Sequence, residues 1–171
     1  HPPVIGLSAR KEVVIEIEGY RINRPEEIET PAFLVYEDLV RHNIAEVVRV
    51  CGSPERGVPH VKTHKSADVL SLQVAAGMTS FKCATVKEAE LLAEGGAREI
   101  IVAYPLLHPK KMRRFMELVG KHPDIEFRVI ASTPEHLAGL SEAAVANKQE
   151  IGVYVDLDTG MHRTGVQPGE E

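Results

Sequence analysis

The sequence is poor in features that would assign it to several protein classes. Of its 171 residues only two are cysteines, Cys51 and Cys83, and they have neither CxxC spacing nor the density of a disulfide scaffold. This usage favours a reducing compartment, so we expect a cytoplasmic protein. The chain begins with His1 rather than Met, and no secretory signal pattern follows. We therefore expect a trimmed or partial chain.

An excess of basic residues and a long apolar run are also missing. Lysine and arginine number 20 against 25 aspartate and glutamate, a formal net charge of −5, and this balance argues against a nucleic-acid partner. Four basic residues cluster within 110–114, but apolar neighbours at helical spacing indicate a solvated helix face. The longest apolar run, residues 100–107, contains Pro105 and falls short of the roughly 20 residues that cross a bilayer. We expect no membrane span.

Short apolar runs alternate regularly with segments of helical spacing. We predict strands near residues 32–36, 59–62, 79–83, 99–104, 125–130 and 151–157. The segments between them carry helix start and stop residues, for example Thr85 with Glu88 at a start and Gly95 with Gly96 at a stop. This alternation predicts an α/β protein whose parallel sheet is covered on both faces.

The spacing of the strands limits the choice of fold. Strands that begin about every 20 to 27 residues suit either a doubly wound sheet or an eightfold barrel, and eight units need roughly 200 residues. From Thr30 onward the chain has room for about six, so we predict an incomplete (β/α)8 TIM-type barrel of about six βα units. Residues 12–17 form a separate β-like run. We therefore divide the chain into an amino-terminal strand and linker, 1–29, and a partial barrel domain, 30–171.

The densest polar cluster is the string Pro-His-Val-Lys-Thr-His-Lys at 59–65, at the carboxyl end of the second predicted strand. Ligands bind at that end of parallel sheets, and on a strand His60, Lys62 and His64 would share one face. A lysine that points into a cleft readily becomes a nucleophile toward an aldehyde, which is Schiff-base chemistry. Two other interpretations stay open: an exposed basic turn, and a zinc pair of the two histidines, although their spacing suits a helix better.

A second polar cluster follows the last predicted strand. Strand alternation puts Asp156 and Asp158 on one face, and a loop bounded by glycines then carries His162 and Arg163. The cluster lies at the same carboxyl end of the sheet. Loop capping and an ion pair with arginine also explain the two carboxylates, so this cluster alone predicts no particular chemistry.

Four strings of residues carry a resemblance to a known family. They are Thr-Pro-Ala-Phe-Leu-Val at 30–35, the lysine string at 59–65, Cys-Ala-Thr-Val-Lys-Glu-Ala-Glu at 83–90, and Asp-Thr-Gly-Met-His-Arg-Thr-Gly-Val at 158–166. In this order and spacing, the chain from about Thr30 to its end resembles the amino-terminal part of D-threonine aldolase and its D-serine dehydratase relatives. These are alanine racemase-like, fold type III pyridoxal phosphate enzymes.

The resemblance implies a barrel that binds pyridoxal 5′-phosphate. Lys62 would form the Schiff base with the cofactor, whereas Lys65 lies beyond the strand end and should leave the pocket. Arg163 matches the arginine that lies near the ring hydroxyl of the cofactor in this family. His60 and His64 match positions that flank the lysine, and we expect them to be pocket residues.

The resemblance also implies a reaction, the cleavage of a D-β-hydroxy amino acid to glycine and an aldehyde, as in D-threonine aldolase. D-serine dehydratase and amino acid racemase are alternatives within the family. A non-catalytic pyridoxal phosphate carrier and a plain interaction scaffold are alternatives of another class. Family members tend to be homodimers, and the aldolase and dehydratase relatives use a divalent metal, whose ligands, with a carboxyl-terminal domain, would lie beyond Glu171. We therefore expect no efficient turnover from this chain without that missing portion or a second subunit.

Overall fold

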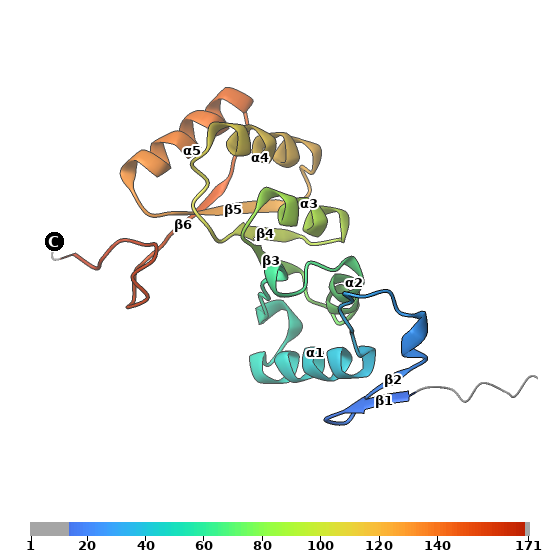
Figure 1. Ribbon diagram of the computed structural model, residues 1–171. Coiled ribbons are helices and arrows are strands. Elements are labelled where there is room, and N and C mark those ends of the chain that lie inside the picture. The colour runs from blue at the N-terminus through green and yellow to red at the C-terminus, as the bar shows by residue number, and fades with distance from the viewer. Residues whose placement is uncertain (1–13, 170–171) are drawn as a thin grey trace, which may run out of the picture. The chain divides into compact units, whose positions relative to one another are not determined.

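The computed structural model describes residues 14–169. The chain divides into two compact units, His1–Tyr36 and Glu37–Glu171 (Figure 1). The boundary after residue 29 that the sequence suggests stays a prediction.

The first unit holds an antiparallel hairpin. Strand β1 (Val14–Ile17) pairs with β2 (Tyr20–Asn23), and the two turn residues between them, Glu18 and Gly19, both have positive φ. Such a turn matches the natural twist of the two strands. The predicted amino-terminal strand is present from Val14 onward, and residues 12 and 13 of that prediction lie outside the described residues. The partner strand β2 was not predicted, because its alternation of apolar and polar residues extends over only four positions and is too short to stand out.

The strand predicted at 32–36 is wrong. These residues form no regular element, and four of the five are exposed. A strand obtains its main-chain hydrogen bonds from a neighbour, and within residues 14–169 no strand pairs with this segment. An apolar run alone does not supply that neighbour.

The second unit is built on a four-stranded parallel sheet. Its strands lie side by side in chain order: β3 (Ser80–Cys83), β4 (Glu99–Val102), β5 (Glu126–Ala131) and β6 (Gly152–Val155). The last four strands predicted from the sequence are thereby confirmed, to within about two residues at each end.

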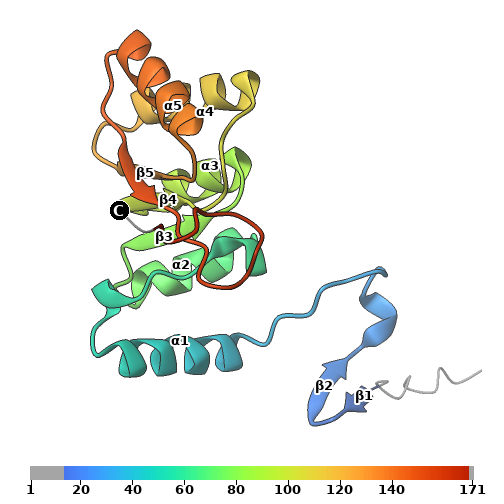
Figure 2. The same cartoon turned by 90° about the vertical axis from the view of Figure 1, so that its left-hand side faces the viewer.

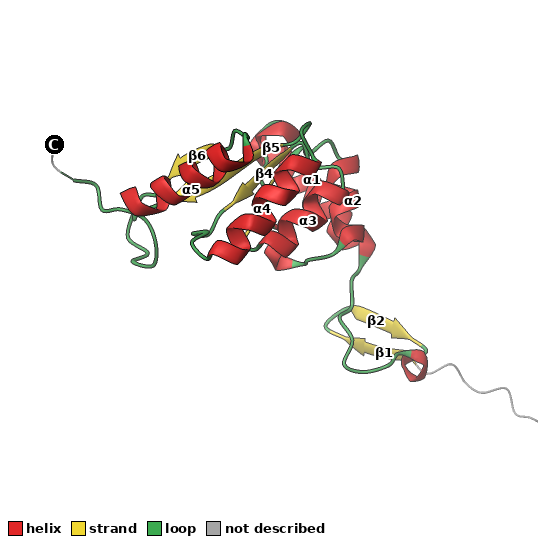
Figure 3. Ribbon diagram, turned by 90° about the horizontal axis from the view of Figure 1, so that it is seen from above, coloured by secondary structure: helices red, strands yellow, loops and turns green. Residues whose placement is uncertain are grey.

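Helices precede the sheet and connect its strands. They are α1 (Glu37–Cys51), α2 (Ala67–Ala75), α3 (Val86–Glu94), α4 (Pro109–Lys121) and α5 (Pro134–Asn147). The connecting helices α3, α4 and α5 lie on one side of the sheet (Figure 3). Right-handed crossovers between strands added in one direction place every helix on the same face. The expectation of helices on both faces is therefore wrong here, and the strand order is that of a singly wound arc, as a barrel requires.

The predicted helix signals act as expected. At the N-termini of α2, α3 and α5, the hydroxyl of the capping residue accepts a hydrogen bond from the amide three residues later. The pairs are Ser66 with Val69 at 3.3 Å, Thr85 with Glu88 at 3.2 Å, and Thr133 with His136 at 3.1 Å. The glycine stops are at Gly77 and Gly96, both with positive φ. The basic residues of 110–114 are exposed on α4, as predicted.

The core lies between the sheet and these helices. Phe81, Ile100 and Phe127 from the strands are buried against Leu92 and Phe115 from the helices, and the rings of Phe115 and Phe127 meet edge to face at 5.8 Å. Each such side chain contributes about 2 kcal/mol by leaving water. The core therefore supports the sheet. Both polar clusters lie at the end of the sheet where its parallel strands terminate, which we call the carboxyl edge.

Neither cysteine is in a disulfide. Cys83 is buried in β3, and burial raises the pKa of its thiol to about 12, so it is an inert core residue. Cys51 at the end of α1 is half-buried. Within the described residues, no helix is both long and apolar enough to cross a membrane.

Candidate functional site

The lysine string runs beside β3 at one edge of the sheet. The Lys82 amide in β3 donates to the Pro59 carbonyl at 2.9 Å, and His60 forms a single parallel bridge with Lys82. Because the two segments run parallel, Lys62 lies level with the carboxyl end of β3. The string thus occupies the place of a first strand without continuing as one.

Pairing stops because the chain turns immediately after the bridge. Residues Val61–Thr63 form a 3-10 helix, and the amides of His64 and Lys65 both donate to the Val61 carbonyl. The strand predicted at 59–62 is therefore wrong beyond His60. As a consequence, the side chains of the two histidines and Lys62 do not share a strand face.

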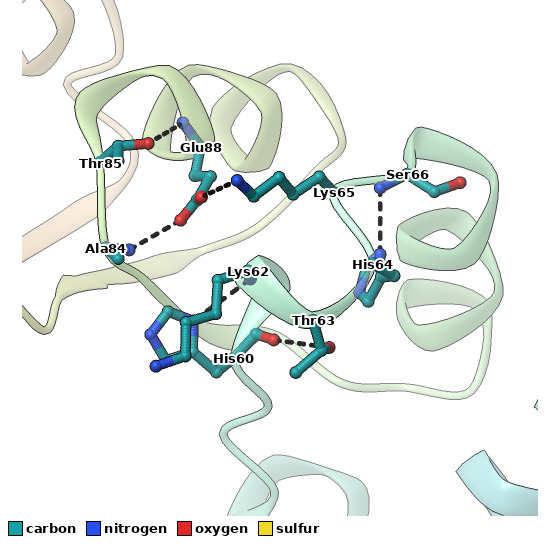
Figure 4. A network of polar contacts seen from close by, with 9 residues as sticks. All are labelled: His60, Lys62, Thr63, His64, Lys65, Ser66, Ala84, Thr85 and Glu88. Atoms are coloured by element: carbon teal, nitrogen blue, oxygen red, sulfur yellow. Dashed lines mark hydrogen bonds and ion pairs between the residues drawn. The ribbon is translucent and has the colours of Figure 1, made fainter. Parts of the chain in front are cut away.

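His60 lies beside Lys62. Its ring nitrogen Nδ1 accepts a hydrogen bond from the Lys62 amide at 3.3 Å (Figure 4). Burial lowers the pKa of His60, and the charge of Lys62 lowers it further. A neutral imidazole that accepts at Nδ1 carries its proton on Nε2. His60 therefore offers a hydrogen-bond donor next to Lys62.

Lys62 and Lys65 differ in their partners. The Lys65 ammonium lies 3.4 Å from Glu88 Oε1, although the lysine side chain is 64% exposed and that of Glu88 only 6%. The Glu88 carboxylate also accepts from the Ala84 amide at 2.8 Å. In the predicted capping box it would accept from the amide of Thr85, so the bond forms one residue earlier in the chain. Lys62 is exposed, and within residues 14–169 it forms no ion pair.

His64 faces α2 rather than Lys62. Its Nδ1 accepts from the Ser66 amide at 3.1 Å, and its Nε2 is buried with no hydrogen-bond partner in the described part of the chain. Burial lowers the pKa of His64, and the nearby Gln73 side chain offsets this only in part. Figure 4 shows the ring on the other side of the segment from His60. The two histidines are thus not paired toward one metal ion, and His64 supports the start of α2.

The second cluster forms a closed loop after β6. The Asp158 amide donates to the Val166 carbonyl at 2.9 Å, and the Val166 amide donates to the Asp156 carbonyl at 2.8 Å. At Gly165 the φ is +98°, and a Cβ would lie 2.5 Å from the Asp158 nitrogen and 2.7 Å from the Leu157 carbonyl carbon. Only glycine fits this approach of backbone to backbone.

Asp158 is the centre of this loop. Its buried carboxylate accepts from the Gly160 amide at 3.0 Å, the His162 amide at 2.9 Å and the Gln167 side chain at 2.7 Å, and it meets Nδ1 of His162 at 2.9 Å. These bonds, that of the His162 amide first, lower the pKa of Asp158. The carboxylate of Asp156 accepts only from the Ser132 hydroxyl, at 3.4 Å, among residues 14–169. Loop capping is therefore the role of Asp158.

Arg163 extends from this loop toward the middle of the sheet. Its guanidinium carbon lies 6.0 Å from the centre of the Tyr104 ring, which follows β4. Because neighbouring strands are about 4.8 Å apart, the loop after β6 reaches back across about 10 Å of the carboxyl edge. Figures 1 and 2 show the dark red segment after β6 at this end of the sheet. No described contact joins Arg163 to Lys62, which lies beyond β3.

Sequence reasoning missed or undervalued three residues of the site. Tyr104, the last residue of the strand predicted at 99–104, contacts Arg163 and, with Pro105, lines a pocket of about 190 Å3. Glu88 was predicted as a capping residue, and its contact with Lys65 follows from the turn after Lys62. Asp158 could not be told from Asp156 by alternation alone. Among the residues described, no group of three or more His, Cys, Asp or Glu side chains is arranged to hold a metal ion.

Comparison with known proteins assigns the larger unit. The sequence family described as "alanine racemase, N-terminal domain" matches residues 35–171. The 3-hydroxy-D-aspartate aldolase of Paracoccus denitrificans is 32% identical over 148 residues, which cover 84% of this chain and 37% of that protein. The D-threo-3-hydroxyaspartate dehydratase of Delftia sp. is 31% identical over 144 residues, which cover 81% and 36%.

A solved structure agrees with this assignment. The D-threonine aldolase from Filomicrobium marinum superposes with a TM-score of 0.76 at 26% identity, over 84% of this chain and 38% of that one. The chain spans little more than a third of the length of these relatives.

Proposed function

The chain belongs to the family of the alanine racemase N-terminal domain, and on this basis we propose that it is the cofactor-binding part of a pyridoxal 5′-phosphate-dependent enzyme, with Lys62 as the cofactor lysine. The family is dependent on this cofactor. The four-stranded arc is then part of a (β/α)8 barrel, an assignment that the strand order and the likeness to a D-threonine aldolase support.

The observation that carries the proposal is the contrast between the two lysines of the string. Lys65 is engaged in an ion pair with the buried carboxylate of Glu88. Lys62 has no carboxylate partner among residues 14–169 and lies beside the donor of His60 at the carboxyl edge. The Lys62 amine can therefore reach an aldehyde without breaking an ion pair, so it suits this role better than Lys65.

The residues at this edge fit the cofactor. Pyridoxal phosphate presents an aldehyde, a phenolic oxygen and a phosphate, and the edge offers the Lys62 amine, the His60 Nε2 donor and the Arg163 guanidinium. Within the described residues Arg163 also has no carboxylate partner. We assign the aldehyde to Lys62 and the phenolic oxygen to Arg163. When bound, the cofactor supplies an electron sink for the bond broken at the α-carbon of an amino acid.

Reductive trapping tests the cofactor lysine. The protein is incubated with pyridoxal phosphate, reduced with borohydride and measured by intact mass, and the adduct is located by peptide mapping. We expect one adduct, on Lys62, which is lost in Lys62→Ala and retained in the matched control Lys65→Ala. Labelling of scattered surface lysines, or an adduct that survives Lys62→Ala, would contradict the assignment.

We further propose that the substrate is a D-β-hydroxy amino acid and that the Cα–Cβ bond is cleaved, as the names of two aldolase relatives suggest. The products distinguish the alternatives when the protein is used in stoichiometric amount with D-threonine and with 3-hydroxy-D-aspartate. Glycine and an aldehyde support an aldolase, ammonia and a 2-oxo acid a dehydratase, and inversion at Cα a racemase. Lys62→Ala measures the background of free cofactor.

A further inference from the structure

The donors that surround Asp158 lie on both sides of Arg163 in the chain. His162 contributes its amide and its ring nitrogen immediately before the arginine, and Gln167 contributes its side-chain amide after it. The bridge between Leu157 and Val166 closes the loop at its base. A buried carboxylate with several N–H donors is costly to disturb, because each donor would lose its partner. Asp158 therefore holds the backbone from which Arg163 extends.

Tyr104 restricts the other end of the same side chain. The Arg163 guanidinium lies within cation–π distance of the Tyr104 ring, and both residues are exposed. An arginine loses much rotamer freedom when it binds an anion. A fixed backbone and a ring contact remove part of that freedom in advance.

We propose that Asp158 and Tyr104 are positioning residues that hold Arg163 ready for the phenolic oxygen of the cofactor. Asp158 acts through the loop backbone, and Tyr104 acts through the face of its ring, so its hydroxyl is not required. This inference rests on the proposed function, because it concerns the arginine that we assign to pyridoxal phosphate.

The test uses pyridoxal phosphate as the probe and two readouts. The first is the dissociation constant by absorbance titration, and the second is the pH at which the absorbance of the bound cofactor changes. With Arg163→Ala as the reference, we expect Asp158→Asn to weaken binding about ten-fold and Tyr104→Leu about three-fold. Both should move the pH midpoint in the direction that Arg163→Ala moves it, whereas Tyr104→Phe should match the parent protein. A merely structural role would reduce the folded fraction without moving the midpoint.

Asp156→Asn is the matched control, since it removes a carboxylate from the same strand end without disturbing the four bonds. If it acts as strongly as Asp158→Asn, the effect is one of charge and the positioning role is overturned. If Arg163→Ala alone shifts the midpoint, the inference fails while the proposed function stands. If Arg163→Ala changes nothing, the assignment of Arg163 to the phenolic oxygen fails and this inference fails with it, while the Lys62 adduct still supports the proposed function. If the parent protein forms no Lys62 adduct, the proposed function itself fails.

Discussion

The two polar segments at the carboxyl edge, 59–66 and 156–167, use their side chains in opposite ways. In the first, each imidazole accepts from an amide two residues later, and Lys62 stays without an ion pair in the described part of the chain. In the second, one buried carboxylate collects four donors and fixes the loop. Short local bonds leave the Lys62 amine without an ion pair in the described residues, whereas converging bonds fix the loop that carries Arg163. In the proposed function, chemistry and positioning would thus be divided between two segments that are about 100 residues apart.

The largest effect should come from the tightest turn of the second segment. Gly165→Ala would place a Cβ against backbone at a positive φ, and we expect it to lower the free energy of unfolding by about 3 kcal/mol. Gly160→Ala is the control, since its φ is also positive but no atom lies within 4 Å of the added Cβ, and it should cost about 1 kcal/mol. Urea unfolding measures both, and equal losses would show that the close approach is relieved easily.

A smaller effect on the free energy of unfolding should distinguish the two segments, when one residue of each is substituted. Asp158→Asn leaves buried donors without a charged acceptor, so we expect a loss of about 2 kcal/mol in the free energy of unfolding. Lys62→Ala should change it by less than about 0.5 kcal/mol, because the side chain is exposed and unpaired within residues 14–169. A large loss in Lys62→Ala would reveal a structural partner and would weaken the contrast between the segments.

The smallest effect concerns the pH at which the contribution of each segment to the free energy of unfolding is lost. Burial lowers the pKa of His64 below the ordinary 6.5, so the unfolded state binds the proton first and stability declines as the pH falls below about 6.5. The pKa of Asp158 is lowered below 3.8, so its contribution is present above that pH and is lost as the pH falls through the lowered value. Unfolding measured between pH 8 and pH 3 should show two windows, and His64→Gln should reduce only the upper one. A reduction in the lower window instead would contradict this assignment.

The parts of the fold predicted from the sequence are those specified by local pattern. Continuous apolar runs with helices between them were sufficient for β3 to β6. Hydroxyl caps with glycine stops were sufficient for α2 and α3, and a hydroxyl cap marked the start of α5. The failures at 32–36 and 59–62 have different causes. Within the described residues no strand pairs with 32–36, whereas 59–62 lies beside β3 but turns into a 3-10 helix after a single bridge. Periodicity reports neither outcome.

For the site, the sequence determined which residue types stand at 59–65 and 158–166, and through them the family and the expected cofactor lysine. Only the tertiary structure decided how each is used. The Val61 carbonyl turns the chain, so His64 faces α2, Lys65 meets Glu88 and Lys62 is left unpaired in the described residues. The fold of the loop brings Arg163 to Tyr104 across two strand spacings. The turn at Val61 is local, but the partners of Lys65 and Arg163 are residues distant in the chain. Burial and such partners are set by tertiary packing rather than by residue type.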